Sequence, residues 1–470
     1  MTISNYEFEW GGETITPYPT ETTVLKMART LVSTGLQDLG YDTVHVDCGF
    51  AVAGNPKTDV LPKAPSCWHC PKPAHCNQSL PCKPLEINAT RFPRGMKPLV
   101  DQLHAMKLKF STYSSGHMCC NKNLRLGMEA ADAAQFVSWG TDAVFYDDCY
   151  TSTASFNAMT AALNKSGHKV YVSIHSPWTS RKVRSDVDPT WPQPSDSAAI
   201  ANDWRTGQDI QLPDDGCSFD RIMDRARNNN VYAKFAGPGR WNWPDILEIG
   251  NPGISDAEGR TQFSLWCLMK SPLRIGTDIT RASAATMNTL SNRAAIAINQ
   301  DRLGVQGTLR RATEEWELWA GPLSGGCVAG LLINLGNGSS MTGLSVRASW
   351  EELGLPAGQR VEVRDLWQDG AVIGQAVGAL NFTIGLHVPG GTAHNCAFLK
   401  LCPLPQKRLL GLDRDLIKSS EGAELAVGHV TKRPGSLIVR DRPWEGRFLN
   451  MFPSICAWSP LPFLIAVRMD

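Results

Sequence analysis

The sequence predicts an α/β protein in which a (β/α)8 TIM barrel precedes a C-terminal antiparallel β-sandwich. Residues 23–300 alternate between amphipathic helical segments and short apolar strands, and this alternation is typical of a parallel sheet with crossover helices. Residues 305–402 contain short alternating strands separated by turn signals, which indicates an all-β module. The length of 470 residues also exceeds what a single hydrophobic core usually supports.

The barrel prediction rests on segments whose apolar residues follow a helical or a strand period. Leu25, Met27, Leu31 and Leu36 share one face of a predicted helix over residues 23–39. The other predicted elements are helices at 95–106 and 129–139 and strands at 43–46, 108–113, 143–146 and 169–174. Polar residues follow several of these strands, at the end of a barrel where active sites lie.

The C-terminal module is predicted from strands at 315–320, 327–334, 361–365 and 382–387, with turn signals such as Asp369-Gly370 between them. Beyond residue 402 neither a helical nor a strand period is clear. We therefore divide the chain into a catalytic barrel over 1–303 with a Cys-rich insertion near 55–85, a β-sandwich over 304–402, and an irregular tail of uncertain origin over 403–470.

The charge balance argues against two classes of partner. Lys and Arg number 46 and Asp and Glu 45, which gives a formal net charge of +1. Such a chain has no overall field to attract nucleic acid or an anionic membrane surface. The sequence also lacks a run of about 18 uncharged apolar residues, the length that a membrane-spanning helix needs. We expect neither nucleic acid nor a membrane as a partner.

The cysteines and glycosylation sequons point to a secretory route. The chain has 14 cysteines and sequons at Asn77, Asn88, Asn164, Asn337 and Asn381, features of oxidising and glycosylating compartments. The N-terminus nevertheless lacks the basic and apolar regions of a signal peptide. We therefore expect a secreted protein whose true start is absent from this sequence.

Four cysteines gather in a Pro-rich stretch at Cys67, Cys70, Cys76 and Cys82. A zinc knuckle is one interpretation, because the first two form a C-x-x-C pair. A loop cross-linked by disulfides is the alternative, and the short second gap together with the secretory features favours it.

Several carboxylates stand at predicted strand ends, namely Asp47, Asp147, Asp148, Asp209 and Asp245. Glycoside hydrolysis uses two such groups, one as nucleophile or base and the other as acid, on opposite faces of the scissile bond. Spacing alone is weak evidence, because every barrel has polar strand ends.

Local motifs are more specific. Residues 136–149 read F-V-S-W-G-T-D-A-V-F-Y-D-D-C and resemble the strand-four motif of glycoside hydrolase family 27, the alpha-galactosidases or melibiases, of fungal type. W-R-T-G-Q-D-I over 204–210 and G-Y-D-T-V-H-V-D-C over 40–48 resemble two further motifs, and the similarity covers about residues 20–400 in the family's order. The resemblance implies a retaining, exo-acting alpha-galactosidase that removes terminal alpha-D-galactosyl residues from oligosaccharides or polysaccharides. It implies a carbohydrate partner and neither cofactor nor metal, and it leaves homodimerisation open.

The resemblance also implies roles for individual residues. Asp147 corresponds to the nucleophile and Asp209 to the general acid/base. Burial and the Asp147 carboxylate would raise the pKa of Asp209, while Arg205 would oppose that shift. The implied substrate-binding residues are Asp47, Tyr113, Arg205 and Trp10. Cys149 is expected to form a disulfide with either Cys119 or Cys120.

The sequence departs from the family pattern at several places. Phe145 stands where the family has a lysine that contacts a sugar hydroxyl, so affinity or turnover should fall. Restoring that lysine should raise kcat/KM, unless Phe145 belongs to a reshaped pocket with its own hydroxyl partner elsewhere. Trp243 replaces an aspartate. Trp10, within residues 7–12, is the nearest remnant of the first-strand motif, which predicts an incomplete first strand and a truncated N-terminus.

These departures keep two alternatives open. An alpha-N-acetylgalactosaminidase of the same family is one, because Ser176 lies near the position that makes room for an acetamido group. A catalytically weakened sugar-binding homologue is the other, because of Phe145 and the incomplete start.

Overall fold

The computed structural model describes residues 2–5, 19–54, 84–118, 123–149, 151–175, 194–211, 217–336, 343–384 and 393–405. Its described residues up to Leu404 belong to one compact unit. Trp10, Ser176, the Cys67–Cys82 cluster and nearly all of the 403–470 tail lie outside the described residues.

The N-terminal part is a parallel sheet of eight strands in the order β7-β6-β5-β4-β3-β2-β1-β8. The strands are β1 Thr2–Asn5, β2 Thr43–Val46, β3 Lys109–Ser115, β4 Ala143–Asp147, β5 Tyr171–His175, β6 Asp203–Arg205, β7 Trp241–Trp243 and β8 Arg274–Ile275. A parallel bridge between Leu247, just after β7, and Ile275 of β8 joins the two ends of the sheet. The predicted (β/α)8 barrel is thereby confirmed.

The first strand differs from its prediction. Sequence analysis places its remnant at 7–12, but Thr2–Asn5 forms β1 and pairs in parallel with both neighbours, through Thr2↔Thr43 and Thr2↔Arg274. Strand pairing needs only extended backbone with free N–H and C=O groups, so a segment without the family motif can fill this position.

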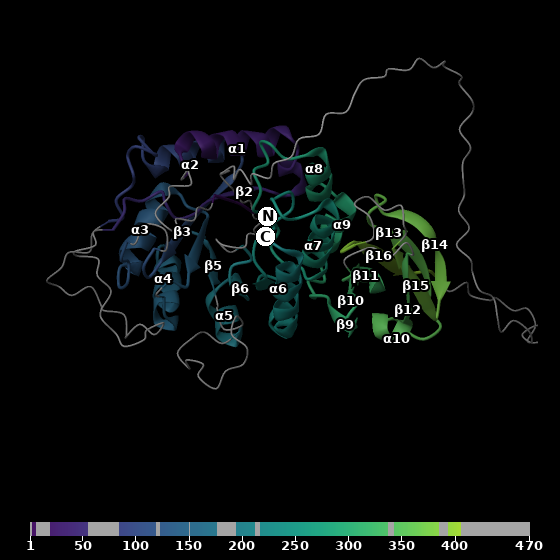
Figure 1. Cartoon of the computed structure of the whole chain (residues 1–470). Helices are drawn as coiled ribbons and strands as arrows, with labels where there is room; N and C mark the ends of the chain where they lie inside the picture. The colour runs from purple at the N-terminus through teal and green to yellow at the C-terminus, as the bar shows by residue number, and fades with distance from the viewer. Residues whose placement is uncertain are drawn as a thin grey trace, which may run out of the picture. The chain divides into compact units, whose positions relative to one another are not determined.

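Nine helices of the barrel part are described, and Figure 1 shows them around the strands. They are α1 Glu21–Ser33, α2 Met96–Ala105, α3 Glu129–Trp139, α4 Thr153–Lys165, α5 Pro194–Ile200, α6 Phe219–Val231, α7 Asp256–Leu268, α8 Ala284–Leu290 and α9 Arg293–Asn299. The four apolar residues predicted to share one face are all buried. The predicted helix over 23–39 is split, however, because the chain turns through Gly35 at φ 75° before the short 3-10 helix Gln37–Leu39.

Local capping explains where these helices begin and end. Thr20 and Thr23 form a reciprocal capping box at the start of α1, and Ser255 and Glu258 form one at the start of α7. α3 ends at Gly140, whose left-handed φ of 86° costs no side-chain clash.

The C-terminal part is an antiparallel sheet in the order β12-β15-β14-β13-β16-β11-β10-β9. Its strands are β9 Thr308–Ala312, β10 Trp316–Pro322, β11 Val328–Asn334, β12 Leu344–Ser349, β13 Arg360–Asp365, β14 Ala371–Val377, β15 Ala379–Ile384 and β16 Cys396–Pro403, with the short helix α10 Trp350–Leu353 between β12 and β13. The sheet folds over itself, because the Phe382 ring of β15 packs directly on Gly330 of β11. A Cβ added to Gly330 would lie only 2.5 Å from that ring. The predicted β-sandwich is thus confirmed.

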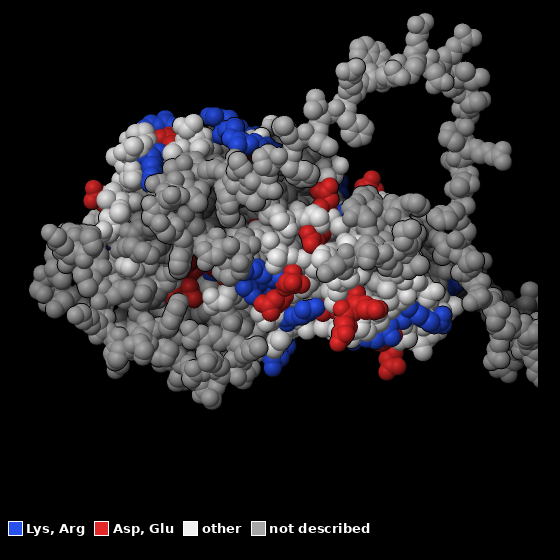
Figure 2. Space-filling view, in the orientation of Figure 1, with Lys and Arg blue, Asp and Glu red and all other residues white. Residues whose placement is uncertain are grey.

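The visible surface agrees with the balanced charge. In Figure 2 the basic and acidic side chains form small groups of both signs, and neither sign covers a broad area of the described surface shown. Within the described ranges, no helix combines the length and the apolar character that crossing a membrane requires.

A disulfide between Cys327 and Cys402 links the start of β11 to the end of β16 across 75 residues. Changing both cysteines to alanine should lower the free energy of unfolding by about 4 kcal/mol, because the bond restricts a long loop of the unfolded chain. Urea denaturation measures this loss. Cys396→Ser, at a free cysteine of the same strand, is the matched control, and an equal loss in both variants would contradict the prediction.

Candidate active site

One pocket opens at the carboxyl ends of the barrel strands and gathers most of the predicted site residues. Its lining includes Asp47 after β2, Tyr113 of β3, Phe145 and Asp147 of β4, Arg205 of β6, Asp209, Trp243 of β7, Asp245 and Arg274 of β8. All predicted catalytic and substrate-binding residues that the structure describes therefore meet in this pocket. Trp10 lies outside the described residues.

Arg205 lies between three carboxylates. Its Nη2 atom is 2.7 Å from Asp209 Oδ1 and 3.8 Å from Asp147 Oδ1, and its Nη1 atom is 3.5 Å from Asp245 Oδ2. Because both of the first two distances start at the same nitrogen, the Asp147 and Asp209 oxygens can be at most about 6.5 Å apart. A space of this size accommodates the anomeric carbon and the glycosidic oxygen of one sugar unit.

Asp147, the last residue of β4, is held as a carboxylate. The Tyr113 hydroxyl donates to its Oδ2 at 2.8 Å, and the backbone N–H of Asp148 donates to its Oδ1 at 2.9 Å. Burial by itself would raise the pKa of Asp147, but the hydrogen bond from His175 and the charge of Arg205 lower it well below its ordinary value. The group is consequently ionised at neutral pH.

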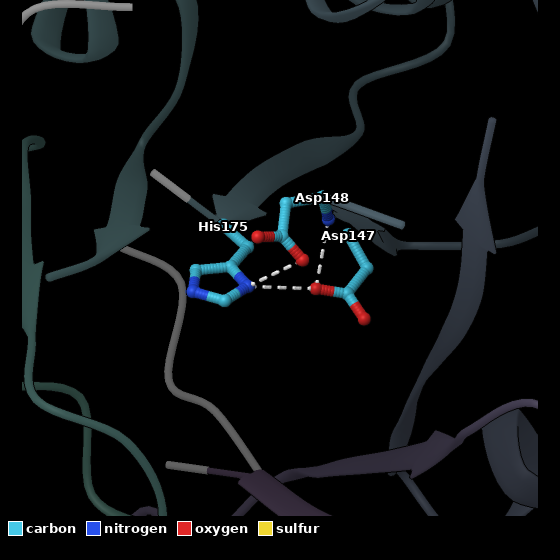
Figure 3. A group of neighbouring side chains, drawn as sticks. All are labelled: Asp147, Asp148 and His175. Atoms are coloured by element: carbon cyan, nitrogen blue, oxygen red, sulfur yellow. Dashed lines mark hydrogen bonds and ion pairs between the residues drawn. The ribbon is translucent and has the colours of Figure 1, made fainter. Parts of the chain in front are cut away.

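His175, the last residue of β5, is a site residue that sequence reasoning missed. Figure 3 shows its Nδ1 facing both Asp147 and Asp148, each at 3.0 Å, and its Nε2–H donates to the Gly207 carbonyl at 2.9 Å. Burial and Arg205, whose Nη2 is 2.6 Å from Nδ1, oppose protonation, yet the two carboxylates raise the pKa of His175 to about 9. The available signal in the sequence was its position directly after the predicted strand 169–174, where polar residues line the end of a barrel.

The same three side chains also suggest a metal site. Ligand atoms of Asp147, Asp148 and His175 all lie within 4.8 Å of one another. Carboxylate and imidazole ligands suit several divalent cations. The Arg205 guanidinium and a protonated His175 already neutralise these carboxylates, which weakens their attraction for a further cation. The expectation that the chemistry needs no metal stays a prediction.

Asp209 stands in a different environment from Asp147. Its side chain is 37% exposed. Loss of hydration raises its pKa, Arg205 opposes this, and the carboxylates Asp245 and Asp147 add to the rise. This is the pattern that sequence analysis expects. The group can therefore hold a proton more readily than an ordinary aspartate.

Asp245 orients the segment that carries Asp209. Its Oδ2 accepts the backbone N–H of Ile210 at 2.8 Å, and its Oδ1 accepts that of Ile246 at 2.8 Å. Asp245 adopts a left-handed φ of 93°, a strained conformation for a residue with a side chain. Strain of this kind persists where surrounding contacts enforce it. In this conformation the Asp245 carboxylate accepts the backbone N–H of Ile210, the residue after Asp209.

Asp47 is held by a neighbouring histidine. His45 Nε2 lies 3.1 Å from Asp47 Oδ2, and His45 Nδ1 lies 2.8 Å from Ser111 Oγ. Burial raises the pKa of Asp47, whereas His45 lowers it. The role of Asp47 as a ligand of sugar hydroxyls stays a prediction, and His45 is a second residue that the motifs did not reveal.

Cys149, two residues after Asp147, is disulfide-bonded, as is Cys48. Both predicted partners of Cys149, Cys119 and Cys120, lie outside the described residues. The choice between them stays a prediction.

Phe145 belongs to an aromatic and cationic floor of the pocket. Its ring centroid lies 5.5 Å from that of Trp243 and 6.0 Å from that of Tyr113, both edge-on. The guanidinium carbons of Arg205 and Arg274 are 5.9 and 5.8 Å from its ring. This arrangement favours the interpretation of a reshaped pocket over simple loss of a lysine.

Comparison with known proteins shows the family of the chain. A family model described as "Alpha galactosidase A" matches residues 18–301, and one described as "Alpha galactosidase C-terminal beta sandwich domain" matches residues 313–401. An alpha-galactosidase of Cyamopsis tetragonoloba is 37% identical over 356 residues, which cover 74% of this chain and 76% of that protein. Alpha-galactosidase 3 of Arabidopsis thaliana is 35% identical over 392 residues, covering 82% of this chain and 78% of that protein.

Solved structures show the same architecture. Alpha-galactosidase I from Mortierella vinacea superposes with a TM-score of 0.66 at 27% identity, covering 83% of this chain and 98% of that one. The alpha-galactosidase from Saccharomyces cerevisiae with raffinose superposes with a TM-score of 0.63 at 23% identity, covering 82% and 94%, and supports the fold alone. The chain therefore belongs to the alpha-galactosidases of glycoside hydrolase family 27 and is a glycoside hydrolase.

Proposed function

We propose that this protein is a retaining, exo-acting alpha-galactosidase that hydrolyses terminal alpha-D-galactosyl residues of oligosaccharides or polysaccharides. The observation that carries the proposal is the pair Asp147 and Asp209, which one arginine bridges and whose pKa values shift in opposite directions. Retaining glycosidases keep their two carboxyl groups about 5–5.5 Å apart, whereas inverting enzymes separate them by about 6.5–9.5 Å to admit a water. The upper bound set by Arg205 favours retention.

In the first step the ionised Asp147 attacks the anomeric carbon. The bond from that carbon to the leaving oxygen breaks, and protonated Asp209 donates its proton to this oxygen. A covalent galactosyl-enzyme forms with inverted configuration. Tyr113 and His175, which hold the Asp147 carboxylate, keep one of its oxygens directed at the sugar.

In the second step Asp209, now a carboxylate, removes a proton from water. The resulting hydroxide attacks the anomeric carbon, and the bond to Asp147 breaks. Two inversions give net retention and return both carboxyl groups to their starting states. Arg205 assists both steps because its positive charge remains between the two groups as negative charge moves from one to the other.

A secreted location is the accompanying proposal. The Cys327–Cys402 disulfide and the disulfide-bonded state of Cys48 and Cys149 support it, because such bonds persist in oxidising compartments. The five sequons add to this support.

Replacing either carboxylate should impair turnover in a way that reveals its role. Asp209→Gly should lower kcat on nitrophenyl alpha-galactoside roughly 10²- to 10⁴-fold, because water then attacks the galactosyl-enzyme without a general base, and Asp147→Gly should lower kcat at least as much. Added azide should rescue each variant, giving beta-galactosyl azide with Asp147→Gly and alpha-galactosyl azide with Asp209→Gly. Asp101→Asn, in an exposed ion pair of α2, is the control. Unchanged turnover in either glycine variant would rule out the assigned roles.

Proton NMR of the first-formed sugar tests retention separately. Hydrolysis should release alpha-galactose before mutarotation, because two inversions occur at the anomeric carbon. Initial beta-galactose would contradict the mechanism.

Turnover of the N-acetylgalactosaminide in place of the galactoside would support the alternative specificity, and galactose binding without any turnover would support the sugar-binding alternative.

His175 should make stability depend on pH. Its pKa rises from 6.5 to about 9 on folding, so the stabilisation is complete below pH 6.5 and is lost as the pH rises through about 9. Between pH 6.5 and about 9 the unfolding free energy of the wild type should therefore fall by up to about 3 kcal/mol. The His175→Gln variant should not show this fall. Urea denaturation at pH 6 and pH 9.5 measures it. His104→Gln, at a half-exposed histidine of α2, is the control, and parallel pH curves for wild type and His175→Gln would refute the prediction.

A further inference from the structure

Arg274 of β8 lies deeper in the barrel than the catalytic carboxylates. Its Nη2 donates to Asp203 Oδ2 at 2.6 Å and to Ser173 Oγ at 2.8 Å. In the register of β5 and β6, Ser173 pairs with Asp203, two residues before the pair of His175 and Arg205. Arg274 therefore stands one layer of side chains below the catalytic layer, and it lines the same pocket.

The guanidinium of Arg274 is fixed in orientation. It lies 3.5 Å above the Trp243 ring, a stacking that suits the planar arginine head. The arginine is 5% exposed, and its partner Asp203 is completely buried. An ion pair and an aromatic face together hold it rigid, so a ligand in the pocket meets a preformed group.

Arg274 keeps donors free. Among the described residues its hydrogen bonds run only through Nη2, and its buried Nε–H has no partner. A guanidinium carries five N–H donors, and a buried donor left unsatisfied is costly. Arg205 also has a buried Nε–H without a partner among the described residues, but both of its terminal nitrogens face carboxylates, whereas at Arg274 only Nη2 does. Arg274 is thus the cation of this pocket with the greater capacity to bind a neutral, oxygen-rich ligand.

We propose that Arg274 is a substrate-binding residue that donates a hydrogen bond to one sugar hydroxyl at the inner end of the pocket. Arg274 on β8 thus provides a cationic hydrogen-bond donor in place of the lysine that the family pattern has on β4, at the position of Phe145. The proposal rests on the proposed galactosidase function and adds a residue that sets specificity within it.

The substitutions that test this must not leave a buried charge unpaired, because a buried Asp203 without a partner would destabilise the fold. The double variant Arg274→Gln with Asp203→Asn removes both charges together. Arg274→Lys keeps the charge beside Asp203 but loses the fork and its extra donors, and serves if the double variant does not fold. Thermal unfolding and circular dichroism confirm that each variant is folded.

The discriminating measurement is kcat/KM on nitrophenyl alpha-galactoside and on its 2-, 3-, 4- and 6-deoxy analogues. On the parent sugar each variant should lose roughly ten- to hundredfold, the effect of one hydrogen bond to a charged group. On the deoxy sugar that lacks the contacted hydroxyl, wild type and variant should be equal. An equal loss on all four analogues would show a merely structural role and overturn the proposal.

Phe145→Lys provides an independent arm. In the wild-type background it places a third cation beside Arg205 and Arg274 and should lower kcat/KM, contrary to the gain expected from the family pattern. In the Arg274→Gln, Asp203→Asn background it should restore part of the lost activity. A gain in the wild-type background would overturn the proposal.

Failure of the galactosidase function would be recognisable separately, as absent hydrolysis by wild type. Isothermal titration calorimetry with galactose then replaces the kinetic assay. Galactose binding that Arg274→Lys weakens supports the role of Arg274, and galactose binding that Arg274→Lys leaves unchanged overturns it.

Discussion

The charge of Arg205 is the interaction on which the proposed catalytic site depends. Like charges brought together in a desolvated pocket repel one another, and such carboxylates would otherwise share protons. The guanidinium touches Asp147, Asp209 and Asp245 at once. Together with the hydrogen bond from His175 it keeps Asp147 ionised, while the raised pKa of Asp209 allows that group to take up a proton. Arg205 lowers the pKa of both carboxyl groups, and the hydrogen bond from His175 to Asp147 adds to that effect, whereas loss of hydration and two neighbouring carboxylates outweigh it at Asp209.

The layer of side chains below the proposed catalytic groups obeys a second electrostatic constraint. Asp203 is fully buried and must be paired, and Arg274 meets this requirement from β8, which only β7 separates from β6 around the closed barrel. The arginine in turn rests on Trp243 and approaches Phe145. Aromatic rings attract cations through their electron-rich faces, so an apolar residue at position 145 is compatible with a strongly polar pocket. Phe145 and Trp243, two departures from the family pattern, therefore belong to one connected arrangement around Arg274.

Much of this protein could be predicted from local sequence. Helical and strand periods identified the barrel and the β-sandwich, because amphipathic patterns reflect which face each element buries. Family motifs singled out Asp147, Asp209 and Arg205, because each lies within a contiguous segment at a strand end, and the three residues line one pocket. Local pattern reasoning was wrong for the helix beyond Ser33, where Gly35 turns the chain, and the family motif was wrong for the position of the first strand.

Other features were decided only by the tertiary structure. His175 gained its role because β5 lies beside β4 and its last residue faces Asp147, and no motif marks that contact. Arg274 meets Ser173, 101 residues away in the chain, only because the barrel curves and closes. Residue types and local periods determine the elements and candidate chemical groups, whereas strand register and barrel closure determine which groups are neighbours. The pKa of each group then follows, because burial and opposing charges act through space and not along the sequence.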